Sequence, residues 1–168
     1  MSDIPIEPDT DAATQAIYVD ADACPVKEEA LRVAERHGLL IHYVSNSWMR
    51  LPEGPLVRRV VVADGPDAAD DWIAERAGEG DVAGTADIPL AARCLKRGAQ
   101  VIGPTGKPFT DEGIGMALAM RELSAHLRET GESKGYNASF TRQDRSRFLE
   151  ALELAVQRAR RMRARPNA

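Results

Sequence analysis

The chain has 168 residues, 43% of them hydrophobic, and a formal net charge of −4. This length supports one substantial core and excludes two enzyme domains of ordinary size. The longest apolar runs are far shorter than the ~20 residues that cross a bilayer, and the acidic start lacks the apolar region of a signal peptide. Cys24 and Cys94 stand apart from any CxxC pattern. The sequence therefore predicts a cytoplasmic protein with reduced thiols and no membrane contact.

Charge is unevenly distributed along the chain. Residues 141–168 contain eight arginines and three acidic residues, a net charge of +5, so residues 1–140 carry −9. A basic tail of this kind is typical of a solvated helix face and also of a segment that contacts nucleic acid. Charge alone favours the solvated face.

Residues 1–15 are rich in Asp, Pro and Thr, and we expect a disordered leader there, a single domain over 16–162 and a frayed basic tail over 163–168. Within the domain, short β-branched runs alternate with helical patterns. The expected strands are 17–20, 40–44, 59–63, a weak one around Val82, and 99–102, and the expected helices are 25–37, 68–77 and 89–97. This alternation predicts an α/β, Rossmann-like sheet, mainly parallel and covered by helices on both faces. Ligands of such sheets bind beyond the carboxyl ends of the strands.

Two longer helices are expected in the last third of the chain. The first should follow Thr110 as its N-cap, and apolar residues at helical spacing predict that one of its faces packs into the core. That face is formed by Met116, Met120, Leu123 and Leu127. The second should open with a capping box between Thr141 and Asp144 and pack through one apolar stripe. The stripe consists of Phe148, Leu152, Val156 and Ala159.

The first candidate functional residues follow the first expected strand, where Asp20 and Asp22 precede Pro25 and a helix. Two carboxylates one residue apart bind one cation together if the turn brings the second side chain round, and hard oxygen ligands favour Mg²⁺ or Mn²⁺. The alternative is structural: Asp22 caps the helix and Asp20 closes a loop. The position of Asp20 directly after a buried strand favours a functional role. For Asp22, the functional role and the capping role are equally supported.

A second acidic group follows the strand expected to end at residue 63. It contains Asp64, Asp67, Asp70 and Asp71. Asp67 suits a helix N-cap with Asp70 at the capping-box position. Capping does not account for all four carboxylates, because such a cluster repels itself unless a cation or an arginine neutralises it.

Asp87 repeats this architecture after the weak strand around Val82. It either caps the next helix or belongs to a site. Three acidic strand-to-helix turns in one parallel sheet place their carboxylates along one edge, and this convergence is a stronger indication of a site than any single motif.

Four segments resemble the YaiI/YqxD family of uncharacterised bacterial proteins (the DUF188 type), over roughly residues 17–152. They are DADACPVK at 20–27, GPDAADDWI at 65–73, TADIPLA at 85–91 and GKPFTDEGI at 106–114. The family is grouped with PIN-like domains, which have a Rossmann-like parallel sheet and whose active members cut RNA or DNA with Mg²⁺ or Mn²⁺ held by acidic residues. The resemblance implies a metal-dependent nuclease that hydrolyses phosphodiester bonds, with RNA expected before DNA as its partner.

The resemblance also implies roles for particular residues. Asp20 resembles the acid after the first PIN strand, Asp70 the acid on the following helix, and Asp87 the last acid of the TxD motif that Thr85 begins. The expected catalytic residues are Asp20, Asp22, Asp70 and Asp87, and the expected metal ligands are these four with Asp67 and Asp71. Asp71 is the alternative to Asp70 for the helix-borne acid.

Further polar residues are candidates for substrate contact. Lys27, in the first turn of the first helix, either faces a substrate phosphate or is solvated. Ser45 and Asn46 follow the second strand, where they either bind a ligand or serve an ordinary turn. Thr85 precedes Asp87 in the TxD motif.

Two other functions remain open at this level. Asp20 and Asp22 also resemble the nucleophile and acid of haloacid-dehalogenase-like phosphatases, with Ser45 as the phosphate-binding hydroxyl and Asp70–Asp71 as the Mg²⁺ motif. This chemistry also needs a basic residue, usually lysine, between the hydroxyl and the acidic pair, and residues 45–70 offer only Arg50, Arg58 and Arg59. The third function is a non-catalytic module that binds nucleic acid or protein. The negative charge gives it some support against a nuclease, since phosphodiesters are repelled unless a cation or the Arg-rich tail screens the body. The oligomeric state is open, with a homodimer among the options.

Overall fold

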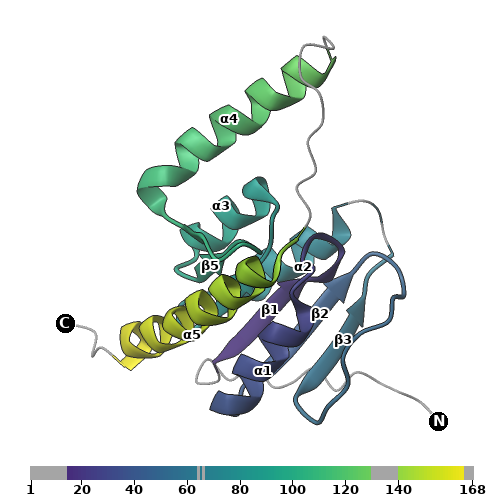
Figure 1. The fold of residues 1–168 in the computed structure, drawn as a ribbon, viewed down its shortest axis with the longest axis vertical. Coiled ribbons are helices and arrows are strands. Elements are labelled where there is room, and N and C mark those ends of the chain that lie inside the picture. The colour runs from purple at the N-terminus through teal and green to yellow at the C-terminus, as the bar shows by residue number, and fades with distance from the viewer. Residues whose placement is uncertain (1–14, 64, 66, 130–139, 165–168) are drawn as a thin grey trace.

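The computed structural model describes residues 15–63, 65, 67–129 and 140–164 (Figure 1). A six-stranded sheet with the order β3-β2-β1-β4-β5-β6 forms its centre. The strands are β1 (Ala16–Asp20), β2 (Leu40–Ser45), β3 (Val57–Val61), β4 (Val82–Gly84), β5 (Gln100–Ile102) and β6 (Pro108–Phe109). The first five are parallel and β6 pairs antiparallel with β5. The predicted α/β class with a mainly parallel sheet is confirmed.

Helices cover both faces of this sheet. α1 (Lys27–His37) and α5 (Arg142–Ala164) cover one face, and α2 (Ala68–Arg76) and α3 (Ile88–Lys96) cover the other. A further helix, α4 (Asp111–Glu129), contacts α3, and a 3₁₀ turn, η1 (Ala21–Ala23), follows β1. Alternate residues of β1 point to opposite faces. Ile17 and Val19 pack in one cluster with α1 and α5, whereas Ala16 and Tyr18 pack in another with α2 and α3. The result is a three-layer arrangement around β1.

The parallel register brings the carboxyl ends of β1, β2 and β4 to one edge, called the carboxyl edge below. Val19 pairs with Gly84, and Asp20 pairs with Val44. The residues that follow each strand, Asp20 with η1, Asn46 after β2 and Thr85 after β4, therefore lie next to each other. This edge is where ligands bind in sheets of this type.

The long helix α5 docks on the α1 face of the sheet, through the apolar stripe that the sequence predicts. Phe148, Leu152, Val156 and Ala159 are all buried. Thr141 and Asp144 exchange the two capping-box hydrogen bonds, each 3.0 Å long.

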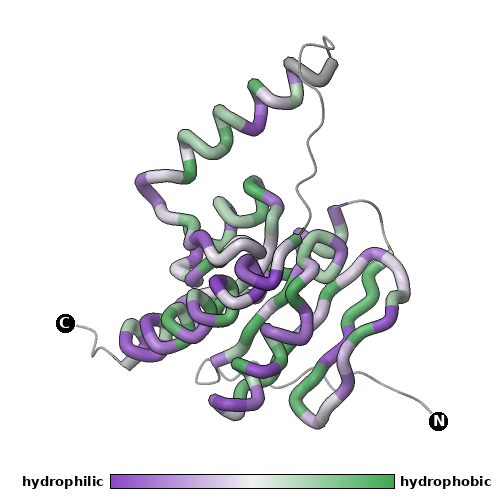
Figure 2. Tube along the Cα trace, in the orientation of Figure 1, coloured by the Kyte–Doolittle hydropathy of each residue, from purple (hydrophilic) through white to green (hydrophobic). Residues whose placement is uncertain are grey.

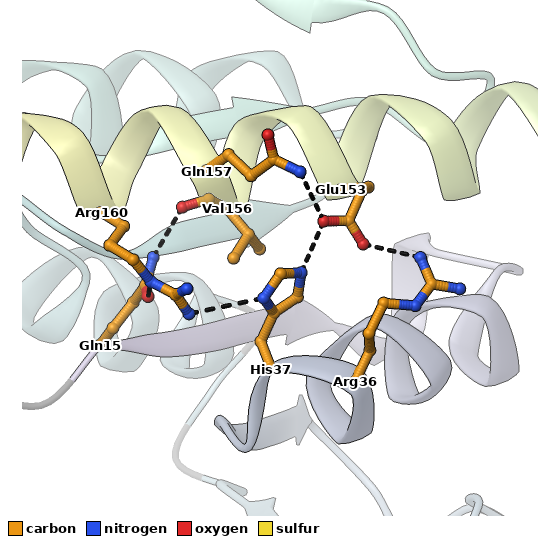
Figure 3. A network of polar contacts seen from close by, with 7 residues as sticks. All are labelled: Gln15, Arg36, His37, Glu153, Val156, Gln157 and Arg160. Carbon is orange, nitrogen blue, oxygen red and sulfur yellow. Dashed lines mark hydrogen bonds and ion pairs between the residues drawn. The ribbon is translucent and has the colours of Figure 1, made fainter.

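A polar network fastens α5 to α1 (Figure 3). Glu153 accepts from Arg36 at 2.7 Å, contacts His37 at 2.6 Å and accepts from Gln157 at 2.9 Å. Burial opposes ionisation of Glu153, but these hydrogen bonds outweigh it and lower the pKa of its carboxyl. Gln15 extends the network by donating to the Val156 carbonyl at 3.0 Å.

The prediction that the apolar face of α4 is buried is wrong. Met116 is 69% exposed, Met120 53% and Leu123 49%, and the side chain of Leu127 lies outside the described residues. Although α4 contacts α3, it projects from the body with hydrophobic residues along its length (Figures 1 and 2). Helical periodicity identifies a common face, but it does not say whether another element covers that face.

Smaller differences concern boundaries and segments that fall outside the described part. The first α-helix, α1, begins at Lys27 rather than at residue 25, and β3 begins at Val57 rather than at residue 59. Of the expected leader and tail, residues 1–14 and 165–168 lie outside the described residues, whereas α5 runs through Ala164. In the described part of the chain, no helix is both long and apolar enough to span a bilayer.

Candidate functional site

Asp20 and Asp87 are joined through the hydroxyl of Thr85. Asp20 is only 4% exposed, and Thr85 is fully buried. The Thr85 hydroxyl donates to Oδ2 of Asp20 at 2.7 Å and accepts from the backbone N–H of Asp87 at 2.9 Å. Asp87 also caps α3, because its Oδ1 accepts from the Leu90 N–H at 2.9 Å. Capping and membership of an acidic site are thus compatible for Asp87.

Asp22 does not cap α1, whose N-cap residue is Val26. Its Oδ2 instead accepts from the backbone N–H of Asn46 at 2.8 Å. The Asn46 side chain in turn accepts from the N–H of Ala69, in the first turn of α2, at 3.2 Å. Asn46 therefore ties the turn after β1 to the helix that carries Asp70.

The neighbouring carboxylates Asp70 and Asp71 have different surroundings. Asp71 is exposed and pairs with Arg93 of α3 at 2.7 Å. Asp70 is half-buried, and its pKa is raised to about 6 by burial and then by the charges of Asp87, Asp20 and Asp67. Of these two carboxylates, Asp70 is therefore the one on which the charges of the other aspartates act.

Asp67 occupies the N-cap position of α2, yet its side chain makes no capping hydrogen bond, so the expected capping box is not formed. Its charge acts on Asp70 instead. Asp64 lies outside the described residues.

The pKa of Asp20 is also raised, mainly by burial and further by Asp87 and Asp22. The Thr85 hydrogen bond and the charge of Lys27 act in the opposite direction. The Lys27 ammonium donates to the Cys24 carbonyl at 2.8 Å, so it faces the turn that carries the aspartates. Around Asp20, acidic side chains nevertheless outnumber basic ones, so the site stays negatively charged.

Other expected contacts have a plainer structural role. The Ser45 hydroxyl is fully buried and donates to the Ser47 carbonyl at 2.7 Å, which is turn chemistry. Sequence reasoning missed Arg93, which neutralises Asp71. Its partner lies 22 residues away on another helix, and no local pattern signals that pairing.

The donor set suits a hard divalent cation, because the carboxylates of Asp20, Asp70 and Asp87 act on one another electrostatically. They do not converge on one point. Among the described residues, no group of three or more His, Cys, Asp or Glu side chains is placed so that it could hold a metal ion. The carboxylates therefore supply the negative charge that a cation site needs, but they are not arranged as a complete set of metal ligands.

Comparisons with known proteins place the chain in a family. A model of the YaiI/YqxD family of uncharacterized proteins matches residues 18–158. A UPF0178 protein of Rhizobium etli is 64% identical over 86% of this chain and 93% of its own length. One of Rhizobium meliloti is 63% identical over 86% and 99%, and one of Rhodopseudomonas palustris is 55% identical over 95% and 97%. No solved structure matches significantly. The chain therefore belongs to the YaiI/YqxD family.

Proposed function

We propose that this protein is a metal-dependent nuclease in which Asp20, Asp70 and Asp87 bind Mg²⁺ or Mn²⁺. The observation that carries the proposal is the buried Thr85 hydroxyl, which donates to Asp20 at 2.7 Å and accepts from the Asp87 N–H at 2.9 Å, so that two acidic residues are held together at the carboxyl edge. The pKa of Asp70 supports it, because burial and the charges of Asp87, Asp20 and Asp67 raise that pKa to about 6. Mutually repelling carboxylates at a ligand-binding sheet edge are typical of functional sites. A divalent cation removes the repulsion, and hard oxygen ligands favour Mg²⁺ or Mn²⁺.

The chain's own residues would orient the ligands. Thr85 holds Asp20, the α3 cap holds Asp87, and Asn46 holds Asp22. Outer hydrogen bonds of this kind fix the direction of a carboxylate and tune its affinity for metal. Lys27 faces the same turn and is suited to contact a phosphate oxygen of the substrate. A bound divalent cation supplies the charge that polarises a phosphodiester and lowers the pKa of an attacking water.

The phosphatase alternative is less well supported. It requires Asp20 as an accessible nucleophile, whereas this carboxylate is 4% exposed and accepts from Thr85. It also requires the Ser45 hydroxyl to reach a phosphate, and that hydroxyl is buried. A non-catalytic binding module would use the same aspartates. The experiment below distinguishes it from a nuclease by testing for cleavage.

The test compares Asp20→Asn and Asp70→Asn with Asp71→Asn as the matched control. Calorimetric titration with Mn²⁺ should show at least about tenfold weaker binding in the first two, since even outer-shell changes cost 10–100-fold. Asp71→Asn should bind like the wild type, because Asp71 is paired with Arg93. Cleavage of RNA, DNA and a phosphate monoester, each with and without Mn²⁺, is measured in parallel.

A nuclease should cut a phosphodiester substrate only with metal and lose this activity in both ligand variants. Hydrolysis of the monoester through a phosphorylated Asp20 would overturn the proposal in favour of a phosphatase. If the protein binds Mn²⁺ but cleaves none of the three substrates, it is a non-catalytic binding module and the nuclease proposal is wrong. Unchanged Mn²⁺ affinity in both variants would show that the aspartates are structural.

A further inference from the structure

Trp48 is an exposed indole held in place by an arginine. Its side chain is 71% exposed. The guanidinium of Arg59, on edge strand β3, lies 5.2 Å from the ring centroid. Arg59 also donates to the Met49 carbonyl at 2.5 Å, which fixes its position next to the ring. An isolated exposed apolar residue needs no explanation, so the meaning of this one depends on its location.

Trp48 lies next to the carboxyl edge. It follows Asn46 by two residues, and Asn46 donates its backbone N–H to the Asp22 carboxylate at 2.8 Å. Two chain steps of ~3.8 Å place its Cα within about 8 Å of the Asn46 Cα. The indole itself lies over Arg59, which pairs with Tyr43 two residues before the end of β2, so a chain bound at the aspartates would reach the indole by crossing the ends of β2 and β3.

Positive side chains border the same region. A hollow of about 400 Å³ next to the turn after β1 is lined by Lys27, Arg50 and Arg145, together with Glu28 and Glu29. Arg145 is 3.5 Å from Glu29. Lys27 faces the aspartate turn, and Arg50 follows Trp48 by two residues. Lys27 and Arg50 thus bring positive charge, which suits phosphate groups, close along the chain to the aspartate turn and to Trp48, and Glu28 and Glu29 offset part of it.

We propose that Trp48, supported by Arg59, is a base-stacking site that holds a single-stranded nucleic acid next to the aspartates, with Lys27 and Arg50 near the flanking phosphates. The inference deepens the proposed nuclease function and rests on it. Every base has a face that stacks on an indole, and an adjacent guanidinium adds a cation–π contribution. Bases inside a duplex have no free face, so the site selects single strands.

The test measures binding of a fluorescent oligouridylate octamer and of an abasic ribose-phosphate octamer of the same length. Ca²⁺ replaces Mn²⁺ so that the carboxylates are neutralised, and the length of each probe is checked after the titration to exclude cleavage. Trp48→Ala should bind oligouridylate at least about fivefold more weakly, the lower end for loss of one stacked aromatic. Trp48→Phe should retain most of the affinity, because a phenyl ring also offers a stacking face. The matched control is Leu154→Ala, which removes an exposed apolar side chain from α5. Wild type, Trp48→Ala and the control should bind the abasic probe equally.

Three results would overturn the stacking site: no binding of oligouridylate by the wild type, equal binding by Trp48→Ala, or the same loss on the abasic probe. A change of oligomeric state in Trp48→Ala, seen by sedimentation, would also overturn it and assign the indole to a protein interface. Cleavage with Mn²⁺ is scored separately. If cleavage depends on Asp20 but binding does not depend on Trp48, only the stacking site is overturned. If binding depends on Trp48 but no cleavage occurs, only the nuclease function is overturned.

Discussion

His42 is a buried titratable residue on β2, away from the carboxyl edge. Its ring stacks on Tyr18 with centroids 4.9 Å apart, and Trp72 lies 5.6 Å away. Among the described residues, its Nδ1 has no hydrogen-bond partner. Burial, followed by the charges of Arg58 and Arg76, lowers its pKa to about 4. The folded protein therefore holds His42 neutral where an unfolded chain would protonate it.

This difference predicts a loss of stability in acid. The pKa of His42 is 6.5 in the reference state and about 4 when folded, so above pH 6.5 the residue is neutral in both states. As pH falls from 6.5 to 4, the unfolded state gains a proton that the folded state cannot bind, and linkage makes this cost about 2 kcal/mol at pH 5. His42→Phe keeps the stacked ring without titration. Its free energy of unfolding should fall less between pH 7 and pH 5 than that of the wild type.

Urea unfolding at the two pH values measures this effect. Asp20 and Asp70 have raised pKa values and change stability with pH in the opposite direction, but they are present in both proteins and cancel in the comparison. His126→Phe, at an exposed position of α4, is the control. A His42 variant with the pH dependence of the wild type would contradict the argument.

At the scale of elements, α4 and α5 have similar apolar periodicity and opposite burial. Phe148 of α5 is fully buried, and its ring lies under Gly84, where an added Cβ would meet it at 3.8 Å. Phe148→Ala should therefore lower the free energy of unfolding by about 3–5 kcal/mol. Met120 of α4 is 53% exposed, and Met120→Ala should change it by no more than about 0.5 kcal/mol. Urea unfolding compares the two directly, and a large loss in Met120→Ala would mean that α4 is covered in solution.

The same pair of helices shows how far the sequence predicts this fold. Alternating strands and helices predict the parallel sheet and the edge where the aspartates gather, because both follow from local patterns and the geometry of βαβ units. Burial of Met116 cannot be predicted this way, since it depends on a distant covering element. The choice between Asp70 and Asp71 likewise depends on Arg93, which only packing of α2 against α3 reveals.

At the scale of the whole molecule, the charge segregation in the sequence is also spatial. The basic end of α5 lies at the amino ends of the strands. Arg160 donates to Gln15 at 3.4 Å, the residue before β1, and Met162 contacts Gln100 at the start of β5 at 3.3 Å. Arg163 lies against Gly80, just before β4. The aspartates occupy the opposite edge, about one strand length away, so the tail does not neutralise them.

This separation predicts that the tail and Lys27 affect the site differently. A five-residue strand such as β1 spans roughly 15 Å, beyond the ~8 Å Debye length at physiological ionic strength. Replacing the exposed Arg158 and Arg161 together by Gln should leave Mn²⁺ affinity unchanged at 150 mM salt. Lys27→Gln should tighten Mn²⁺ binding, because Lys27 acts on Asp20 and its positive charge opposes that of the metal. Calorimetric titration of both variants decides the matter: a tail variant that shifts Mn²⁺ affinity as much as Lys27→Gln would show that the basic end reaches the aspartates.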